Sequence, residues 1–96
     1  MRTGAHIAYI LASRRNGTLY IGITSNLAVR LGPHRSGHGS EFVKKYRVHM
    51  LVHAETFASP QDAIAREKQL KNWRQDRKIQ LIEKDNPGWS DLSHLL

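Results

Sequence analysis

The sequence of 96 residues has no cysteine, few aromatic side chains and no long apolar run. The lack of cysteine excludes disulfides and thiolate metal sites, and it permits a reducing compartment. No run approaches the roughly 20 apolar residues that cross a bilayer, and residues 1–6 do not resemble a signal peptide. Aromatic residues make up only 7%, which argues against a stacking platform for single-stranded nucleic acid. These absences predict a cytoplasmic protein with no membrane partner.

Acidic residues are also scarce. Asp and Glu together number 8 against 15 for Lys and Arg, which gives a formal net charge of +7. A positive field of this size attracts polyanions, and phosphate contacts dominate the affinity of most nucleic-acid-binding proteins. A basic surface without a polyanion partner explains the same count. The charge alone therefore leaves a nucleic-acid partner and a plain basic surface as alternatives.

The apolar residues predict three strands. Residues 6–14 and 18–24 are rich in β-formers, and Asn16-Gly17 between them is typical of a hairpin because both residues tolerate positive φ. Residues 48–57 alternate between two faces, which indicates a third strand. A sheet of this size needs helices packed on it to be stable.

Three helices are expected around this sheet. The first follows the second strand, and the Gly32-Pro33 pair makes it either short or kinked. The second begins after Ser59, a good N-cap ahead of a proline, and the third covers about residues 75–84. The predicted fold is α/β (α+β), with a small three-stranded antiparallel sheet flanked by helices. We expect one domain over residues 1–96, with a core over about residues 6–92.

Two tyrosines and a glycine mark the paired strands. Tyr9 and Tyr20 lie close to the hairpin and become neighbours if their offsets from the turn are equal. Tyrosine is also common in strands for ordinary packing reasons. Gly22 follows Tyr20 by two residues, and a glycine inside a strand indicates either a bulge or a close approach of backbone or ligand.

Basic side chains recur at helical spacing after the hairpin. Arg30 and His34 are four residues apart and share one face if the helix continues through Pro33. Arginine binds two phosphate oxygens and stays charged, and histidine exchanges a proton near neutral pH. A solvated basic face is the alternative. His49 and His53 share one side of the third strand and are expected at the surface.

One carboxylate lies in an apolar stripe. Glu67 follows Ala63 and Ile64 and precedes Leu70 on the expected inner face of the second helix. A carboxylate that faces a core is costly unless it is paired or bound to a cation. Magnesium needs one or two carboxylates, with water and phosphate oxygens completing its shell. A metal ion and an ion pair with a nearby arginine are both consistent with this position.

The order of these features resembles the GIY-YIG nuclease superfamily, and most of all its small stand-alone bacterial members. A strand tyrosine comes first, then the hairpin, then Tyr20-Ile21-Gly22, and later Arg30 and Glu67 on separate helices. The first triplet is Ile7-Ala8-Tyr9 in place of Gly-Ile-Tyr, which keeps the tyrosine. The resemblance covers about residues 7–92, and it is strongest over residues 19–30, 67–74 and 86–89.

The resemblance implies a metal-dependent endonuclease that hydrolyses phosphodiester bonds in duplex or branched DNA, in a process such as DNA repair. Glu67 would bind one Mg²⁺ or Mn²⁺ ion, and Arg30 would stabilise the phosphate. Tyr9, as a phenolate, would be the general base, with His34 or Tyr20 assisting. Because a free tyrosine has a pKa of about 10, a neighbour must lower it.

Further residues would hold the flanking DNA, and two rival functions remain. The proposed nucleic-acid contacts are Gly22, Lys44, Lys45, Arg47, Arg66, Lys68, Lys71 and Arg74, and Asn86 is a further site candidate. A partner protein or a homodimer would supply targeting. The first rival is a nucleic-acid-binding module of the same fold with little turnover, in which the Gly32-Pro33 pair misplaces His34. The second is a structural or protein-interaction domain with no polyanion partner.

Overall fold

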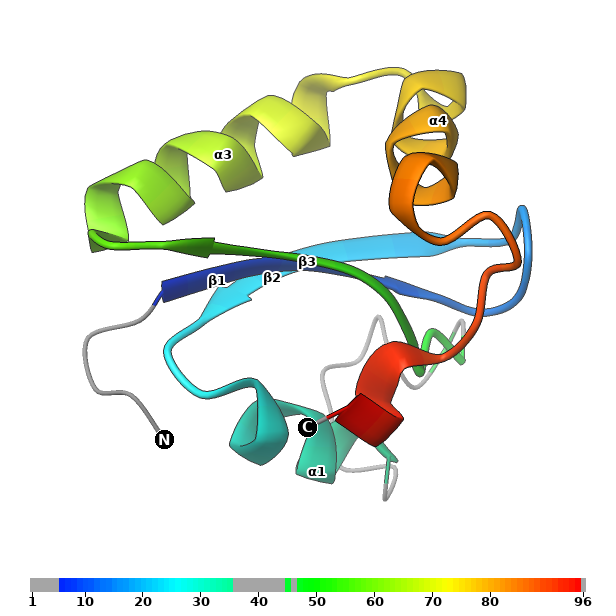
Figure 1. Ribbon diagram of the computed structural model, residues 1–96, viewed down its shortest axis with the longest axis horizontal. Helices are drawn as coiled ribbons and strands as arrows, with labels where there is room; N and C mark the ends of the chain where they lie inside the picture. Colours follow the sequence, from blue (N-terminus) through cyan, green and yellow to red (C-terminus); the bar gives the residue numbers. More distant parts are fainter. Residues whose placement is uncertain (1–5, 36–44, 46, 96) are drawn as a thin grey trace.

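The computed structural model describes residues 6–35, 45 and 47–95, with the backbone alone for residues 32–35 and 95. A three-stranded antiparallel sheet in the order β2-β1-β3 lies between two layers of helices (Figure 1). This arrangement confirms the predicted α/β (α+β) class. The elements in chain order are β1 (His6–Ala12), β2 (Leu19–Thr24), α1 (Leu27–Arg35), β3 (Met50–Phe57), α3 (Pro60–Asn72), α4 (Gln75–Asp85) and the 3-10 helix η1 (Leu92–Leu95).

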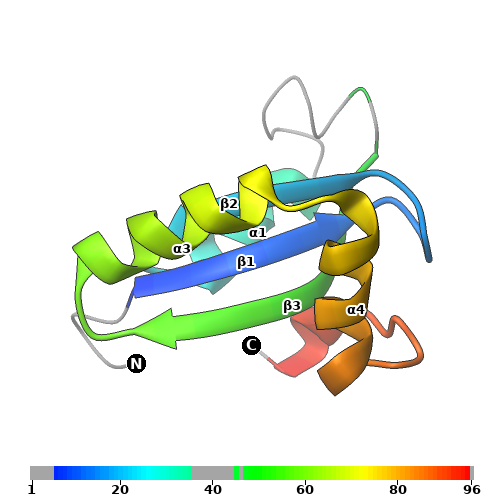
Figure 2. The ribbon, with the colours of Figure 1, turned by 90° about the horizontal axis from the view of Figure 1, so that it is seen from above.

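The sheet separates two hydrophobic cores because helices cover both of its faces. α3 and α4 lie over one face, and α1 and η1 lie over the other (Figure 1 and Figure 2). The middle strand β1 alternates between the cores: Tyr9 and Leu11 face α1, whereas Ile10 and Ala12 face α3 and α4. Every residue from Ala8 to Ala12 is fully buried. Side chains on β1 are therefore held rigidly from both sides.

The hairpin between β1 and β2 is confirmed, but its turn lies one residue earlier than predicted. The backbone N–H of Gly17 donates to the carbonyl oxygen of Arg14 over 2.9 Å, so Arg15 and Asn16 are the central residues. Asn16 has a φ of 58°, which asparagine tolerates better than most residues. Gly17 lies outside the left-handed region. The Asn-Gly pair thus predicted the turn, although only Asn16 of the two residues has a positive φ.

α1 is short and passes through its Gly-Pro pair. The side chain of Asn26, and not that of Ser25, caps its N-terminus by accepting the backbone N–H of Val29 at 3.2 Å. The helix then continues through Gly32-Pro33 and ends at Arg35. The Gly-Pro pair therefore does not end this helix of nine residues.

The two later helices begin where the sequence predicts. Ser59 caps α3 by accepting the backbone N–H of Asp62 at 3.2 Å, and α4 begins at Gln75. Ala63 and Leu70 form the buried stripe of α3. Ile64 was expected in this stripe, but its side chain is 38% exposed. The prediction was wrong for Ile64 because the face of α3 that packs on the sheet includes fewer residues than the apolar pattern of the helix suggests.

The alternation predicted for the third strand fails at a bulge. Ile10 pairs with His53 and Leu11 pairs with Leu51, so Val52 is an extra residue in β3. A bulge shifts the phase of a strand by one residue. Val52 and His53 consequently both lie on the side of α3 and α4, and His53 is only 5% exposed. The expectation that His53 is a surface residue was wrong for this reason.

Asn86 holds the bulge in place. Its side-chain Nδ2 donates to the carbonyl oxygen of the bulged Val52 at 3.2 Å and to that of Ser90 at 2.9 Å. Its Oδ1 accepts the backbone N–H of Ser90 at 3.0 Å. Both polar atoms of this buried amide are therefore used in packing the C-terminal segment against β3. Asn86 thus has a structural role, and its place among the site candidates stays a prediction.

None of the helices in the described ranges has the length and apolar character of a transmembrane segment.

Candidate active site

The Tyr9 phenol and the backbone of Gly22 meet across the first hairpin. The two residues are direct partners in the ladder between β1 and β2, whose register is regular. A Cβ atom on Gly22 would lie 2.6 Å from the Tyr9 hydroxyl oxygen and 2.8 Å from Cζ. Of the two explanations for this glycine, the close approach is therefore correct and the bulge is not. Gly22 leaves the space that the phenol occupies.

Replacing Gly22 by alanine is expected to destabilise the fold, because the Tyr9 ring is fully buried and has no room to retreat. Overpacking of this kind costs roughly 1–3 kcal/mol. Gly88→Ala is the matched control, since the nearest atom to its Cβ, the Oγ of Ser90, is 3.9 Å away. Urea unfolding of both variants measures the difference. Equal stabilities would show that the Tyr9 ring moves freely and that Gly22 has no steric role.

Tyr20 lies diagonally across the ladder from Tyr9. Its direct partner is Leu11, two residues after Tyr9, so the two tyrosines do not have equal offsets from the turn. The two phenol rings still share the α1 face of the sheet, with ring centroids 6.5 Å apart and planes inclined by 45°. The hairpin therefore brings both tyrosines together, as predicted.

The hydroxyl of Tyr9 is buried and forms no hydrogen bond of standard geometry with the described residues, although the Arg30 side chain lies close enough to act on it as a hydrogen-bond donor. Burial raises its pKa above the ordinary 10.0, and the nearby Tyr20 and Glu67 raise it further. The Arg30 guanidinium opposes them and lowers the pKa, but it does not outweigh burial. The expectation that a neighbour lowers this pKa was thus wrong in its net sign, because the strand is covered on both faces.

Three of the predicted site residues lie near enough to the Tyr9 hydroxyl to influence its pKa, and Glu67 has the smallest effect of the three. Tyr20 comes from β2, Arg30 from α1 and Glu67 from α3. Arg30 is exposed and takes part in none of the ion pairs among the described residues. The backbone of His34 lies one turn after Arg30 in α1, but its side chain lies outside the described residues.

Glu67 is partly buried and paired with a lysine. One of its carboxylate oxygens, Oε2, is 3.3 Å from the Nζ of Lys71, one turn later in α3. The Glu67 side chain is 18% exposed and that of Lys71 is 55% exposed. Helical pairs of this kind contribute only about 0.2–0.5 kcal/mol. The pair is therefore a weak competitor for any cation that the carboxylate can bind.

A metal ion at Glu67 would depend on few protein ligands. The described residues contain no cluster of three or more His, Asp or Glu side chains. Magnesium is often held by one or two carboxylates, with water and phosphate oxygens as its other ligands. A partly exposed single carboxylate suits that kind of site.

Comparison with known proteins identifies the family of this domain. The family model described as the GIY-YIG catalytic domain matches residues 5–80. The chain belongs to the GIY-YIG family. It is 35% identical over 78 residues to a UPF0213 protein of Staphylococcus haemolyticus, covering 81% of this chain and 94% of that protein. It is also 35% identical over 83 residues to a UPF0213 protein of Bacillus velezensis, covering 86% and 83%.

A solved structure has the same fold. The solution NMR structure of a UPF0213 protein from Bacillus halodurans matches with a TM-score of 0.57 and 26% sequence identity. The match covers 95% of this chain and 96% of that one. The chain is thus a GIY-YIG nuclease-type domain that resembles small bacterial proteins over most of its length.

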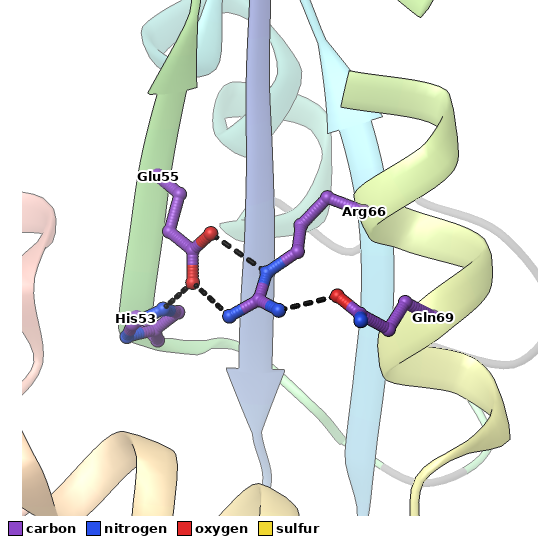
Figure 3. A network of polar contacts seen from close by, with 4 residues as sticks. All are labelled: His53, Glu55, Arg66 and Gln69. Carbon is purple, nitrogen blue, oxygen red and sulfur yellow. Dashed lines mark hydrogen bonds and ion pairs between the residues drawn. The ribbon is translucent and has the colours of Figure 1, made fainter. Parts of the chain in front are cut away.

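The GIY-YIG domain also contains a polar network that the sequence did not reveal (Figure 3). Arg66 reaches from α3 across β1 to Glu55 on β3, with Nε 2.8 Å from Oε1 and Nη2 3.1 Å from Oε2. Nη1 of Arg66 donates to the Oε1 of Gln69, and Nε2 of His53 lies 2.7 Å from the Oε2 of Glu55. Each of the three guanidinium nitrogens therefore has a protein partner. Arg66 thus fastens α3 to the sheet, and the phosphate contact expected of it stays a prediction.

Glu55→Gln is expected to destabilise the domain in a pH-dependent way. Partial burial alone would raise the pKa of the Glu55 carboxyl, but hydrogen bonds from Arg66 and His53 outweigh it and hold the pKa below 4.5. A lowered pKa stabilises the fold above the unfolded-state value, and this contribution is lost as the pH falls through the folded-state value. Losing charged hydrogen bonds costs roughly 1–2 kcal/mol here at pH 7.

Chemical unfolding at pH 7 and at about pH 3 measures this difference, with Asp85→Asn at an exposed position as the control. The variant and the wild type should converge at the lower pH. A difference that stays constant with pH would mean that packing, and not the charge of Glu55, explains the loss.

The other predicted nucleic-acid contacts lie at the surface as far as the structure describes them. Lys45, Arg47, Lys68, Lys71 and Arg74 are exposed. Arg74 is 88% exposed at its side chain, and its Nε lies 3.6 Å from the Oδ1 of Asp76. Lys44 lies outside the described residues. Lys68, Lys71 and Arg74 give the C-terminal half of α3 and the turn after it a positive surface.

Proposed function

We propose that this GIY-YIG domain is a divalent-metal-dependent endonuclease that hydrolyses phosphodiester bonds in DNA. The observation that carries the proposal is the buried Tyr9 hydroxyl, which forms no hydrogen bond of standard geometry in the described part of the chain and has the Arg30 side chain beside it. The charge of Arg30 lowers the pKa of this hydroxyl, and the charge of Glu67 raises it. A phenol, a guanidinium and a carboxylate are the groups that in-line attack on a phosphate needs.

The unsatisfied hydroxyl supports a catalytic role. A buried polar group without a partner costs about 1–3 kcal/mol, so native proteins rarely keep one unless it has a function. A water molecule or a substrate oxygen would satisfy the Tyr9 hydroxyl and be oriented by it. The rigid burial of β1 would hold that contact in one geometry.

Arg30 would bind the non-bridging oxygens of the scissile phosphate. Its side chain is exposed and without a carboxylate partner among the described residues, so its charge is available to an incoming anion. Charge that develops on the phosphate in the transition state is stabilised most by donors already in place. The planar guanidinium provides two such donors at once.

Glu67 would hold one Mg²⁺ or Mn²⁺ ion and release Lys71. A bound ion of this kind supplies Lewis-acid stabilisation of the phosphate oxygens and of the leaving 3′-oxygen. Lys71, once displaced, is free to contact a neighbouring phosphate, as predicted for it.

Tyr9 would accept the proton of the attacking water as a phenolate. Since its pKa lies above 10.0 in the free protein, the phenolate is a minor form at neutral pH. The neighbouring phenol of Tyr20 is placed to assist, with its ring centroid 6.5 Å away. We therefore expect cleavage to be slow at neutral pH and to accelerate as the pH rises.

Cleavage assays test the proposal directly. The chain is incubated with supercoiled plasmid, branched duplexes and single-stranded oligonucleotides in Mg²⁺, Mn²⁺ or EDTA. Nicking that requires metal, and that disappears in the Tyr9 and Glu67 variants purified in the same way, supports an endonuclease. Tight binding without cutting on every substrate would overturn the proposal and leave a binding module of the same fold.

A further inference from the structure

The chain turns from α3 into α4 at an elbow (Figure 1). Residues of this elbow line a cleft. Its volume is about 330 Å³. The lining consists of one aromatic ring, two arginines, one acid and two amides, namely Trp73, Arg74, Arg77, Asp76, Asn72 and Gln80. A cleft of this size and polarity suits a small polar group.

Arg77 is held at this cleft without being neutralised. Its guanidinium lies 4.1 Å from the centroid of the Trp73 ring. A ring face attracts a cation and orients it, but it leaves the charge in place. Arg77 takes part in none of the ion pairs within the described ranges. Its positive charge is therefore available for an anion.

The ring under Arg77 is itself fastened to the sheet. The Arg66 guanidinium lies 5.0 Å from the Trp73 centroid, and Arg66 is bound to Glu55 on β3. A chain of contacts thus runs from the carboxylate of Glu55 through Arg66 and Trp73 to Arg77. Because the carboxylate of Glu55 neutralises Arg66, the positive charge of this series of contacts that has no acidic partner among the described residues is that of Arg77.

The one acid in the lining does not cancel that charge. Asp76 Oδ1 lies 3.6 Å from Nε of Arg74 and accepts the backbone N–H of Arg77 at 3.0 Å. Arg74 and Asp76 therefore balance each other. The remaining side-chain charge in the lining is that of Arg77, and the amides of Asn72 and Gln80 add neutral donors.

We propose that this elbow cleft binds a backbone phosphate of DNA, next to the site of Tyr9 and Glu67. The inference rests on the proposed function in taking DNA as the ligand. Glu67 and Asn72 are five residues apart in α3, which is about 7.5 Å along the helix axis. The cleft would therefore hold a phosphate that flanks the scissile one on the same DNA.

Binding of a fluorescein-labelled duplex, followed by anisotropy over a range of NaCl concentrations in EDTA, tests this site without cleavage. Arg77→Gln should weaken binding about tenfold at low salt and reduce the slope of log affinity against log salt by about 0.9, because one phosphate contact is lost. Arg77→Lys should keep most of the slope, because it retains the charge. Lys84→Gln is the matched control, with the same charge change on an exposed residue in the last turn of α4.

The outcomes separate this proposal from the proposed function. Equal salt slopes for Arg77→Gln and Lys84→Gln would show that the cleft binds no phosphate. If the wild type still nicks DNA in the presence of metal, the proposed endonuclease function is unaffected by that result. A slope change specific to Arg77, without nicking on any substrate, would support the cleft and overturn the endonuclease. The absence of salt-dependent DNA binding by the wild type would overturn both. Thermal melts confirm that each variant is folded.

Discussion

Tyr9→Phe is expected to abolish most cleavage and, at the same time, to make the fold more stable. The substitution removes only the hydroxyl, which is buried and forms no hydrogen bond of standard geometry in the described part of the chain. Removing an unsatisfied buried group recovers roughly 1–2 kcal/mol of its desolvation cost. Losing a general base slows a reaction by about 10²–10⁴-fold. Stability and activity should therefore move in opposite directions, as is common at functional sites.

The rate of cleavage by the wild type is also expected to depend on pH. Because burial holds the pKa of Tyr9 above 10.0, the phenolate fraction should rise tenfold for each pH unit below that value. A plot of log rate against pH should therefore climb with a slope near 1 between about pH 6.5 and 8.5. The residual rate of Tyr9→Phe should lack this slope.

Tyr20→Phe is the control for both measurements, since it removes a hydroxyl from the neighbouring, less buried ring. It should not raise the melting temperature, and its loss of activity should be smaller. Wild-type rates in Tyr9→Phe would show that its hydroxyl is not the base. A less stable Tyr9→Phe would show that the hydroxyl has a partner that holds the fold.

Glu67→Gln is expected to reduce nicking on the order of 100-fold or more, because a neutral amide is a poor ligand for Mg²⁺ or Mn²⁺. It should cost little stability, since the only described ion pair of Glu67 is the helical contact with Lys71 at 3.3 Å. Isothermal titration with Mn²⁺ should show a large loss of metal affinity in the same variant.

Lys71→Gln distinguishes a metal ligand from a mere partner in an ion pair. In the proposed site, the ammonium of Lys71 would compete with a metal ion for the carboxylate that it contacts at 3.3 Å. Its removal should therefore strengthen Mn²⁺ binding, whereas removal of the Glu67 charge weakens it. If the two substitutions changed stability equally and left Mn²⁺ affinity unaltered, Glu67 would have no role beyond the pair.

Local sequence signals predicted that Tyr9 and Tyr20 are neighbours, because a hairpin is a local structure. A turn at Asn16 places Tyr9 and Tyr20 on one face, since side chains alternate with a period of two along each strand. Capping residues likewise marked the starts of α1 and α3. These features depend on contacts within a few residues along the chain, which a sequence pattern records.

Features that depend on contacts between distant elements were missed. The bulge at Val52 follows from pairing β1 with β3, and it turns His53 inward beside Glu55. Arg66 pairs with Glu55, eleven residues away in the sequence, although it had been expected among the basic residues that hold flanking phosphates. The side chain of Asn86 donates a hydrogen bond to the carbonyl oxygen of Val52 in the same bulge. No periodicity reports an extra residue in a strand, because its effect appears only when the partner strand is in place.

The sequence alone determined the three strands, the helices, the family and the two tyrosines with Arg30 and Glu67 as the residues to examine. Only the tertiary structure decided that the Tyr9 hydroxyl is enclosed without a hydrogen bond of standard geometry in the described part of the chain, that Gly22 leaves room for it, and that its pKa is raised. The physical reason is that strands, turns and helix caps depend on residues close together in the sequence. Desolvation of one oxygen atom, in contrast, depends on every element that packs around it.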